Sequence, residues 1–234
     1  MKARLLFLPV LALLCSSCAL QADWVDDYAL LLKKYVTPDG GRYADWKKNT
    51  SDVATLDHVV NAIAAQTKND GLAFYINAYN AWILHEALAK YPTKSVRDAL
   101  FSFFITDRIT VGGTKMSFNK LEKDVIRAKF KEPRVHFALN CASRSCPPLS
   151  AEPFRSHELD AHLERLARAF VNSDRGVRLK SGSVELSKIF DWYKDDFGGT
   201  PGVLTFINKR RTQPIPADAK ITYQTYNWNL NETK

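Results

Sequence analysis

Residues 70–90 form the segment that most constrains the fold of this chain. Large apolar residues recur on every side of a helix drawn through this segment. Asp70 can cap the N-terminus of the helix, and Tyr91 ends it because a residue before proline avoids the α region. A helix that is apolar on all sides is buried. The sequence therefore predicts a buried helix over residues 70–90.

Further helices and antiparallel hairpins are expected along the rest of the chain. Apolar residues at helical spacing predict further helices, which we place at residues 23–35, 56–65, 119–130, 156–170, 187–197 and 201–208. Two segments have a turn that contains glycine, with apolar and polar residues alternating on either side of it. This pattern predicts two antiparallel hairpins, at residues 108–118 and 177–186. Alternation also predicts strands at residues 134–140 and 221–230. We expect one α+β domain with helices packed around antiparallel hairpins, because no linker or repeat divides the chain.

Residues 1–19 have the pattern of a secretory signal peptide. A positively charged start precedes an apolar run that is too short to cross a bilayer as a helix. Cys18 follows small residues that resemble a bacterial lipobox, which would make Cys18 a lipid anchor, and ordinary cleavage after Ala19 or Ala22 is the alternative. We expect an exported protein, periplasmic or held at the membrane by a lipid, whose single folded domain spans residues 23–234.

The charge distribution argues against a nucleic-acid partner. The formal net charge is +8, and it falls to +6 when the two cations of the predicted signal peptide, Lys2 and Arg4, are left out. The remaining cations are spread along the chain, and their densest run, 209–211, is short. Nucleic-acid sites concentrate cations in a stripe. We therefore expect a peptide, a glycan or an envelope protein as partner, and contact with a membrane only through the lipid.

The spacing of histidine and cysteine does not favour a metal site. His157 and His162 are five residues apart, which places them on different faces of a helix, and Cys141 and Cys146 lack a matching second pair. The chain also has no glycine-rich phosphate loop and no G-x-S-x-G elbow. We expect neither a metal nor a cofactor.

The stretch 136–149 is the main candidate for chemistry, because it carries two thiols directly after a predicted strand. A thiol becomes a nucleophile when a nearby cation or imidazole lowers its pKa, and Arg144 is the cation nearest to Cys141 in the sequence. His136 is a candidate base, but five residues of extended chain would put it about 16 Å from Cys141 and on the opposite face. A sharp turn after Asn140 would be needed to bring the two together.

Two alternatives remain open at these positions. A histidine from another element, such as His85, could serve as the base in place of His136. In an oxidising compartment, Cys141 and Cys146 could instead form a disulfide, since the four residues between them allow Cα atoms to come within the usual range of about 4.4–6.8 Å. Two inert buried thiols are the remaining interpretation.

Asn77 and Asn80 are three residues apart, so they share one face of the helix predicted at residues 70–90. A buried amide that finds no partner costs about 1–3 kcal/mol. The pair therefore either braces a neighbouring loop or lines a pocket, where it would orient a histidine or donate to an oxyanion.

The segment 191–197 mixes aromatic and acidic residues. We expect Trp192 and Phe197 to lie in the core. We expect Asp195 and Asp196 to lie on a solvated face.

Four motifs together are similar to the domain of unknown function 547 family. They lie in the family's order at residues 74–81, 136–149, 186–197 and 226–231, and the best-matched part of the chain is 70–231. The family has no assigned activity, so the resemblance implies a domain common in secreted bacterial proteins and no particular reaction. It also implies that Cys141 is the more regular of the two thiols, because relatives carry serine in place of Cys146. Asn227 stands where the closing motif usually has aspartate, and an asparagine can also orient a histidine.

Two functions of different class follow. The first is a cysteine hydrolase or acyltransferase of the cell envelope, with a fold of papain or transglutaminase type, in which Cys141 attacks an amide or ester carbonyl. Its expected catalytic residues are Cys141, His136, Asn80 and Asn77. Its expected substrate-binding residues are Arg144, Asn140, Cys146 and Asn227. The second is a non-catalytic binding or scaffold module in which a Cys141–Cys146 disulfide is a staple.

Overall fold

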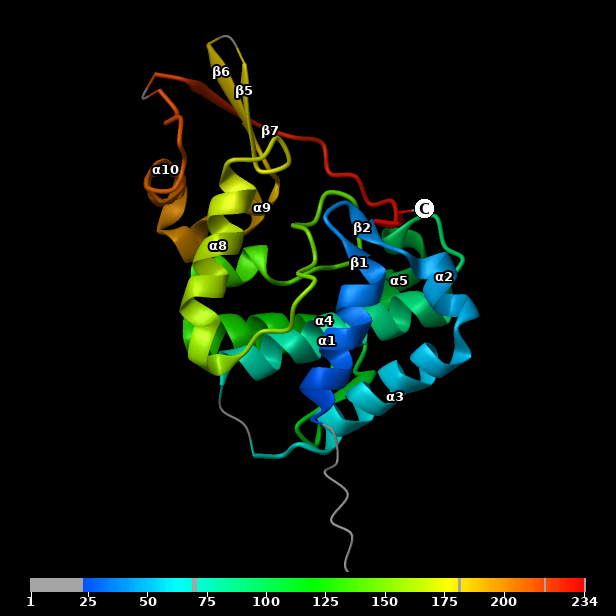
Figure 1. The fold of residues 1–234 in the computed structure, drawn as a ribbon. Coiled ribbons are helices and arrows are strands. Elements are labelled where there is room, and N and C mark those ends of the chain that lie inside the picture. The colour runs from blue at the N-terminus through cyan, green and yellow to red at the C-terminus, as the bar shows by residue number, and fades with distance from the viewer. Residues whose placement is uncertain (1–22, 69–70, 181, 217, 234) are drawn as a thin grey trace, which may run out of the picture.

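Helix α4 (Leu72–Lys90) runs through the middle of the molecule (Figure 1), and it confirms the buried helix predicted at residues 70–90. The computed structural model describes residues 23–68, 71–180, 182–216 and 218–233. Buried residues occupy every side of α4, and Tyr91 follows its last turn in an extended conformation. The signal peptide predicted at 1–19, the lipid anchor predicted at Cys18 and the cap predicted at Asp70 lie outside the described residues.

Three N-terminal helices form a layer on one side of α4, namely α1 (Trp24–Tyr35), α2 (Tyr43–Lys48) and α3 (Thr50–Ala65). Helices α2 and α3 pack against α4, and α1 packs against α3. Helix α1 begins as predicted, because the Asp23 side chain accepts a hydrogen bond from a first-turn backbone N–H. Helix α3 begins earlier than the predicted residue 56, because Asn49 caps it in the same way.

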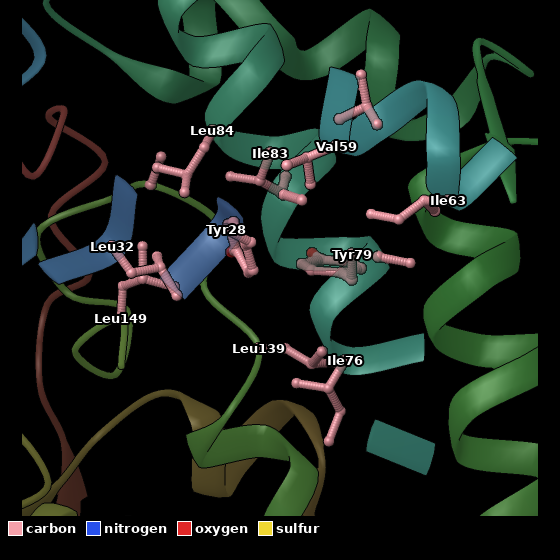
Figure 2. Packing of buried hydrophobic residues seen from close by; sticks show 14 of the residues in the cluster. Tyr28, Leu32, Val59, Ile63, Ile76, Tyr79, Ile83, Leu84, Leu139 and Leu149 are labelled. Atoms are coloured by element: carbon pink, nitrogen blue, oxygen red, sulfur yellow. The ribbon is translucent and has the colours of Figure 1, made fainter. Parts of the chain in front are cut away.

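The main core lies between these helices and a loop from the middle of the chain. Figure 2 shows side chains of α1, α3 and α4 gathered in one cluster, with two leucines of the loop beside them. The labelled side chains are Tyr28, Leu32, Val59, Ile63, Ile76, Tyr79, Ile83, Leu84, Leu139 and Leu149. Burial of this apolar surface is the main force that fixes α4 in the centre.

Short antiparallel hairpins connect the helices, namely β1 (Val36–Thr37) with β2 (Gly40–Gly41), and β3 (Ile109–Val111) with β4 (Thr114–Met116). The second of these confirms the hairpin predicted at 108–118. Its turn residues Gly112 and Gly113 have φ values of +57° and +79°, a conformation that glycine adopts at no steric cost.

A three-stranded sheet stands at one end of the molecule (Figure 1). Strands β5 (Val177–Lys180) and β6 (Ser183–Leu186) form the second predicted hairpin, and β7 (Lys220–Tyr223) pairs in parallel with β6. The prediction of one strand over 221–230 is wrong beyond Tyr223. The chain there runs across the molecule in isolated bridges, and the Asn227 side chain accepts a hydrogen bond from the backbone N–H of Asn229, which interrupts a ladder.

One helix of mixed type occupies the region predicted as a helix at 119–130. It consists of α6 (Phe118–Lys120), a π-helical stretch η1 (Leu121–Arg127) and α7 (Ala128–Phe130). Ser117 caps it, because its hydroxyl accepts a hydrogen bond from the backbone N–H of Lys120.

The strand predicted at 134–140 is wrong, and a short 3₁₀ helix η2 (Pro133–Phe137) takes its place. Pro133 opens that helix with a fixed φ, and the Glu132 side chain caps it by accepting from the backbone of Arg134. All residues from 135 to 140 are buried. The alternation that predicted a strand therefore did not separate an inner face from an outer one.

A second core cluster gathers around Phe137, Phe170 and Phe190. Besides Phe137 of η2, its helical residues come from α8 (Leu159–Val171), α9 (Ile189–Trp192), η4 (Lys194–Phe197) and α10 (Gly199–Asn208). A short 3₁₀ helix, η3 (Ser156–Glu158), precedes α8. The single helix predicted at 187–197 is thus divided in two.

The fold is a mixed helix and sheet domain with small antiparallel hairpins, as predicted. Helix α5 (Val96–Ile105) completes it beside α6. Within the described residues, we find no helix whose length and apolar character would let it cross a membrane.

Candidate functional site around Cys141

A cavity of about 560 Å³ opens beside Cys141. Its wall combines residues that are remote in sequence, among them Cys141, Cys146 and His136 from the middle of the chain, and Trp192, Tyr193, Tyr226 and Trp228 from the C-terminal part. His136 and Cys141 were expected on opposite faces of an extended strand. The 3₁₀ helix η2 replaces the start of that strand, and both residues line one cavity.

The loop that carries Cys141 is held by backbone contacts with the C-terminal segment. Ala142 has a φ of +61°, a conformation that costs a non-glycine residue energy and turns the chain sharply. The Asn140 side chain accepts a hydrogen bond from the Ala142 backbone at 2.8 Å, and Ala142 O accepts one from Asn231 N at 2.9 Å. The turn needed after Asn140 is thus present, and the C-terminal segment stabilises it.

Cys141 Sγ lies within hydrogen-bond distance of three polar side chains. Cys141 Sγ lies 2.9 Å from Cys146 Sγ and 3.1 Å from Ser143 Oγ. The Tyr226 hydroxyl lies 3.4 Å from the same sulfur and accepts a hydrogen bond from Ser143 Oγ at 2.9 Å. Both cysteines are free thiols, so the disulfide interpretation does not describe this structure.

The two thiols differ in ionisation. Hydrogen bonding with Cys146 first, and then with Ser143 and Tyr226, outweighs burial and lowers the pKa of Cys141 to about 6. Burial raises the pKa of Cys146 well above its ordinary value. Of the two thiols, Cys141 is therefore the one that loses its proton more readily.

His136 is fixed on the cavity wall by a carboxylate. His136 Nε2 lies 2.7 Å from Asp196 Oδ2, and the imidazole stacks on the Tyr193 ring with centroids 3.9 Å apart. Arg127 donates two hydrogen bonds to the same carboxylate, at 2.6 and 3.0 Å. The hydrogen bond with His136 first, and then those from Arg127, hold the pKa of Asp196 well below its usual range. Because Nε2 faces Asp196, Nδ1 is the nitrogen left to exchange a proton.

His85 takes no part in the cavity. Its Nε2 lies 3.0 Å from Asp57 Oδ1, its ring packs edge-on against Trp82, and it is not among the described residues that line the cavity. Of the two histidines considered as a base, only His136 shares the cavity with Cys141.

Asn77 and Asn80 hold neighbouring loops by their backbones. Asn77 donates to Phe154 O and accepts from Phe154 N, both at 2.8 Å. Asn80 donates to Ala138 O at 2.8 Å and accepts from Asn140 N at 2.9 Å. Both amides are thus satisfied by backbone groups, and Asn80 positions the residue that precedes Cys141.

The four residues predicted to bind substrate lie at different places. Cys146 lines the cavity beside Cys141. Asn140 is buried and donates to Pro147 O at 2.7 Å. Arg144 is exposed and donates to Glu232 O at 3.1 Å. Asn227 is exposed and binds Ser145 through its backbone N–H, at 2.8 Å.

Arg144 was expected to be the cation that lowers the pKa of Cys141, and this expectation is wrong. Hydrogen bonds, and not the charge of Arg144, lower the pKa of Cys141. A turn that points the backbone of Arg144 at the C-terminal segment leaves its side chain outside the cavity.

Sequence reasoning missed three contributors to the site. Asp196 was expected on a solvated face, yet it pairs with His136 and Arg127. Trp192 was expected in the core, yet it is 46% exposed, whereas Phe197 is buried as predicted. Tyr226 was not chosen, although it opens the closing motif at 226–231. The position of Asp196 and Tyr226 inside two of the four motifs was the signal that could have identified them.

Within the described part of the chain, no group of three or more His, Cys, Asp or Glu side chains is placed to hold a metal ion.

A family profile described as "Protein of unknown function, DUF547" matches residues 63–171. Residues 63–171 belong to the DUF547 family. The match confirms the resemblance seen in the sequence and includes Asn80, His136 and Cys141, whereas Asp196 and Tyr226 lie beyond the matched DUF547 segment. Comparison with curated proteins and with solved structures gave no significant match. The DUF547 description assigns no activity.

Proposed function

We propose that this protein is a cysteine-dependent hydrolase or acyltransferase in which Cys141 is the nucleophile. One observation carries the proposal: a free thiol of lowered pKa opens on a cavity whose wall also holds a carboxylate-bound imidazole. A cysteine nucleophile, an imidazole and a third polar side chain that orients the imidazole are the parts that such cysteine enzymes combine, and the third group is an asparagine in papain-type enzymes. Here they would be Cys141, His136 and Asp196.

The reaction would proceed in two steps. The Cys141 thiolate attacks the carbonyl carbon of an amide or ester, and the tetrahedral intermediate expels an amine or alcohol that takes its proton from His136. The resulting thioester is then attacked by water or by an amine, which gives its proton to His136 as the thiolate leaves. Asp196 keeps the imidazole in one orientation and stabilises its protonated form.

The cavity favours an acyl donor with an apolar or aromatic group. The rings of Trp192, Tyr226 and Trp228 form one wall, with centroids 4.5 to 5.8 Å apart. Trp192 and Ile105, which are 46% and 58% exposed, lie at this cavity and belong to the few large apolar side chains that are exposed among the described residues. An exposed apolar surface at a cavity marks a place for an apolar partner.

The signal pattern in the sequence would place this activity in the cell envelope. A peptide, a glycan or an envelope protein would then supply the acyl group, either in the periplasm or beside a lipid-anchored enzyme. The amino-acid pattern at 1–19 and at Cys18 supports that location.

One observation favours the alternative of a non-catalytic binding module. Among the hydrogen bonds of the described residues, none joins Cys141 Sγ or Cys146 Sγ to a histidine. In enzymes without substrate, catalytic hydrogen bonds are often long and tighten only in the complex. An assay is therefore required to separate the two functions.

The test uses p-nitrophenyl esters of acetic and phenylacetic acid as acyl donors. We expect a burst of nitrophenol, with the acyl group found on the tryptic peptide 135–144, and a larger rate for the aromatic ester. Cys141→Ala should abolish the adduct, and His136→Gln should slow turnover by about 10²–10⁴-fold. His85→Gln is the matched control and should behave as the unchanged protein. Turnover that survives in Cys141→Ala would leave the binding module as the better account.

A further inference from the structure

We propose that Cys141 and Cys146 form a reversible disulfide that switches the site off. The inference rests on the proposed function only for its consequence, the loss of the nucleophile. The modification itself follows from the geometry of the two thiols. Cys141 Sγ and Cys146 Sγ lie 2.9 Å apart, so less than about 1 Å of approach would complete an S–S bond of about 2.05 Å.

The backbone holds the two sulfurs in this position. The N–H of Cys141 donates to Cys146 Sγ at 3.0 Å, and the N–H of Cys146 donates to Ser143 O at 3.2 Å. The N–H of Arg144 and that of Ser145 each bind the C-terminal segment, at Asn229 O and Asn227 O. The loop is thus anchored on both sides, and bond formation requires little movement of the chain.

The two thiols differ in their exposure to solvent, so each has a different role in the oxidation. Cys141 is partly exposed on the cavity, so a small oxidant or reductant can reach it. Cys146 is only 5% exposed and reaches Cys141 more directly than it reaches solvent. This division between an attacking thiol and a resolving thiol is the one found in redox-sensitive cysteine pairs.

Hydrogen peroxide is the oxidant that we propose. The Cys141 thiolate attacks one peroxide oxygen, the O–O bond breaks, and a sulfenic acid and hydroxide result. Cys146 sulfur then attacks the sulfenyl sulfur, the S–S bond forms, and the departing hydroxide takes the Cys146 proton to leave as water. Two electrons pass from the thiol pair to peroxide. A dithiol reverses the reaction by two thiol–disulfide exchanges and is itself oxidised.

The positions of the tryptic sites make this bond easy to detect. Arg144 lies between the two cysteines, so trypsin separates them into peptides 135–144 and 145–155. The two peptides stay together only where the disulfide exists. Cysteines outside this segment cannot imitate that product.

The experiment treats the full chain with about one equivalent of hydrogen peroxide, alkylates the remaining thiols and maps the tryptic peptides. We expect joined peptides 135–144 and 145–155, and an at least ten-fold loss of Cys141 alkylation that dithiothreitol reverses. Cys146→Ser keeps Cys141 but cannot form the bond, so dimedone should trap a sulfenic acid on Cys141 in that variant. Thermal unfolding checks that both proteins are folded.

Separate peptides in the oxidised, unchanged protein, with dimedone on Cys141 as in Cys146→Ser, would overturn the inference. The outcome does not depend on turnover. Joined peptides in a protein without acyl transfer would leave the disulfide standing and remove the proposed function. Acyl transfer without joined peptides would do the reverse.

Discussion

Two sets of polar groups lie side by side in this molecule and differ in how they are satisfied. The brace, which we define as the buried amides of Asn77, Asn80 and Asn140, binds backbone groups at 2.7 to 2.9 Å. The second set consists of Cys141, His136, Asp196 and Tyr226. It pairs mainly side chain with side chain, and its members other than Asp196 line the cavity. Groups of the first kind stabilise a fold, and groups of the second kind keep capacity for a ligand.

The largest effect is expected from the brace. Asn80→Ala would leave Ala138 O and Asn140 N buried without a partner, so the free energy of unfolding should fall by about 2–4 kcal/mol. Urea unfolding measures this loss. Asn61→Ala, at an exposed position of helix α3, is the control and should change stability little. A loss in Asn80→Ala as small as that of the control would break the distinction between the two sets.

A smaller loss, of about 1–3 kcal/mol at neutral pH, is expected from Asp196→Asn, because a charged hydrogen-bond partner of His136 and Arg127 is removed. The pKa of Asp196 is lowered in the folded protein, so its contribution is complete above the unfolded pKa of about 3.9 and is lost as the pH falls. The difference between Asp196→Asn and the unchanged protein should therefore shrink between pH 7 and pH 3. The exposed neighbour variant Asp195→Asn serves as control. A difference that stays constant over this range would contradict the assignment.

Removal of the thiol should affect stability least among the cavity residues. Cys141→Ala is expected to change the free energy of unfolding by less than about 1 kcal/mol, because Ser143 and Tyr226 keep their own hydrogen bond. Urea unfolding beside Asn80→Ala makes the comparison direct. Destabilisation as large as that of Asn80→Ala would place Cys141 with the brace.

The smallest expected effect concerns reactivity alone. Tyr226→Phe removes one hydrogen bond to Cys141 Sγ, so the pKa of Cys141 should rise and its alkylation at pH 6 should slow by about two- to five-fold. Tyr223→Phe, on strand β7 and outside the cavity, is the matched control. Equal rates in both variants would remove Tyr226 from the site.

The sequence predicted those helices and hairpins that a pattern of neighbouring residues specifies. The all-round apolar pattern of 72–90 gave α4, and paired glycines gave the hairpin at 109–116. The strand expected at 134–140 failed because all six residues of 135–140 are buried, so alternation carried no information.

The site was predicted only in part, for a physical reason. Cys141 and His136 were chosen for their chemistry, and the structure places both at one cavity. Asp196 contacts His136 from 60 residues farther along the chain, and Tyr226 contacts Cys141 from 85 residues farther along. Such long-range contacts depend on how the second core packs and leave no trace in local periodicity.

The most direct test of the account is the pH profile of Cys141 alkylation. Iodoacetamide labelling of the full chain, read on peptide 135–144 from pH 4.5 to 10, reports the thiolate fraction of Cys141 alone. We predict a midpoint near 6, well below the ordinary thiol pKa of about 8.5, with peptide 145–155 unlabelled until the pH is high. A midpoint at or above 8.5, or faster labelling of Cys146, would contradict a nucleophile at this position.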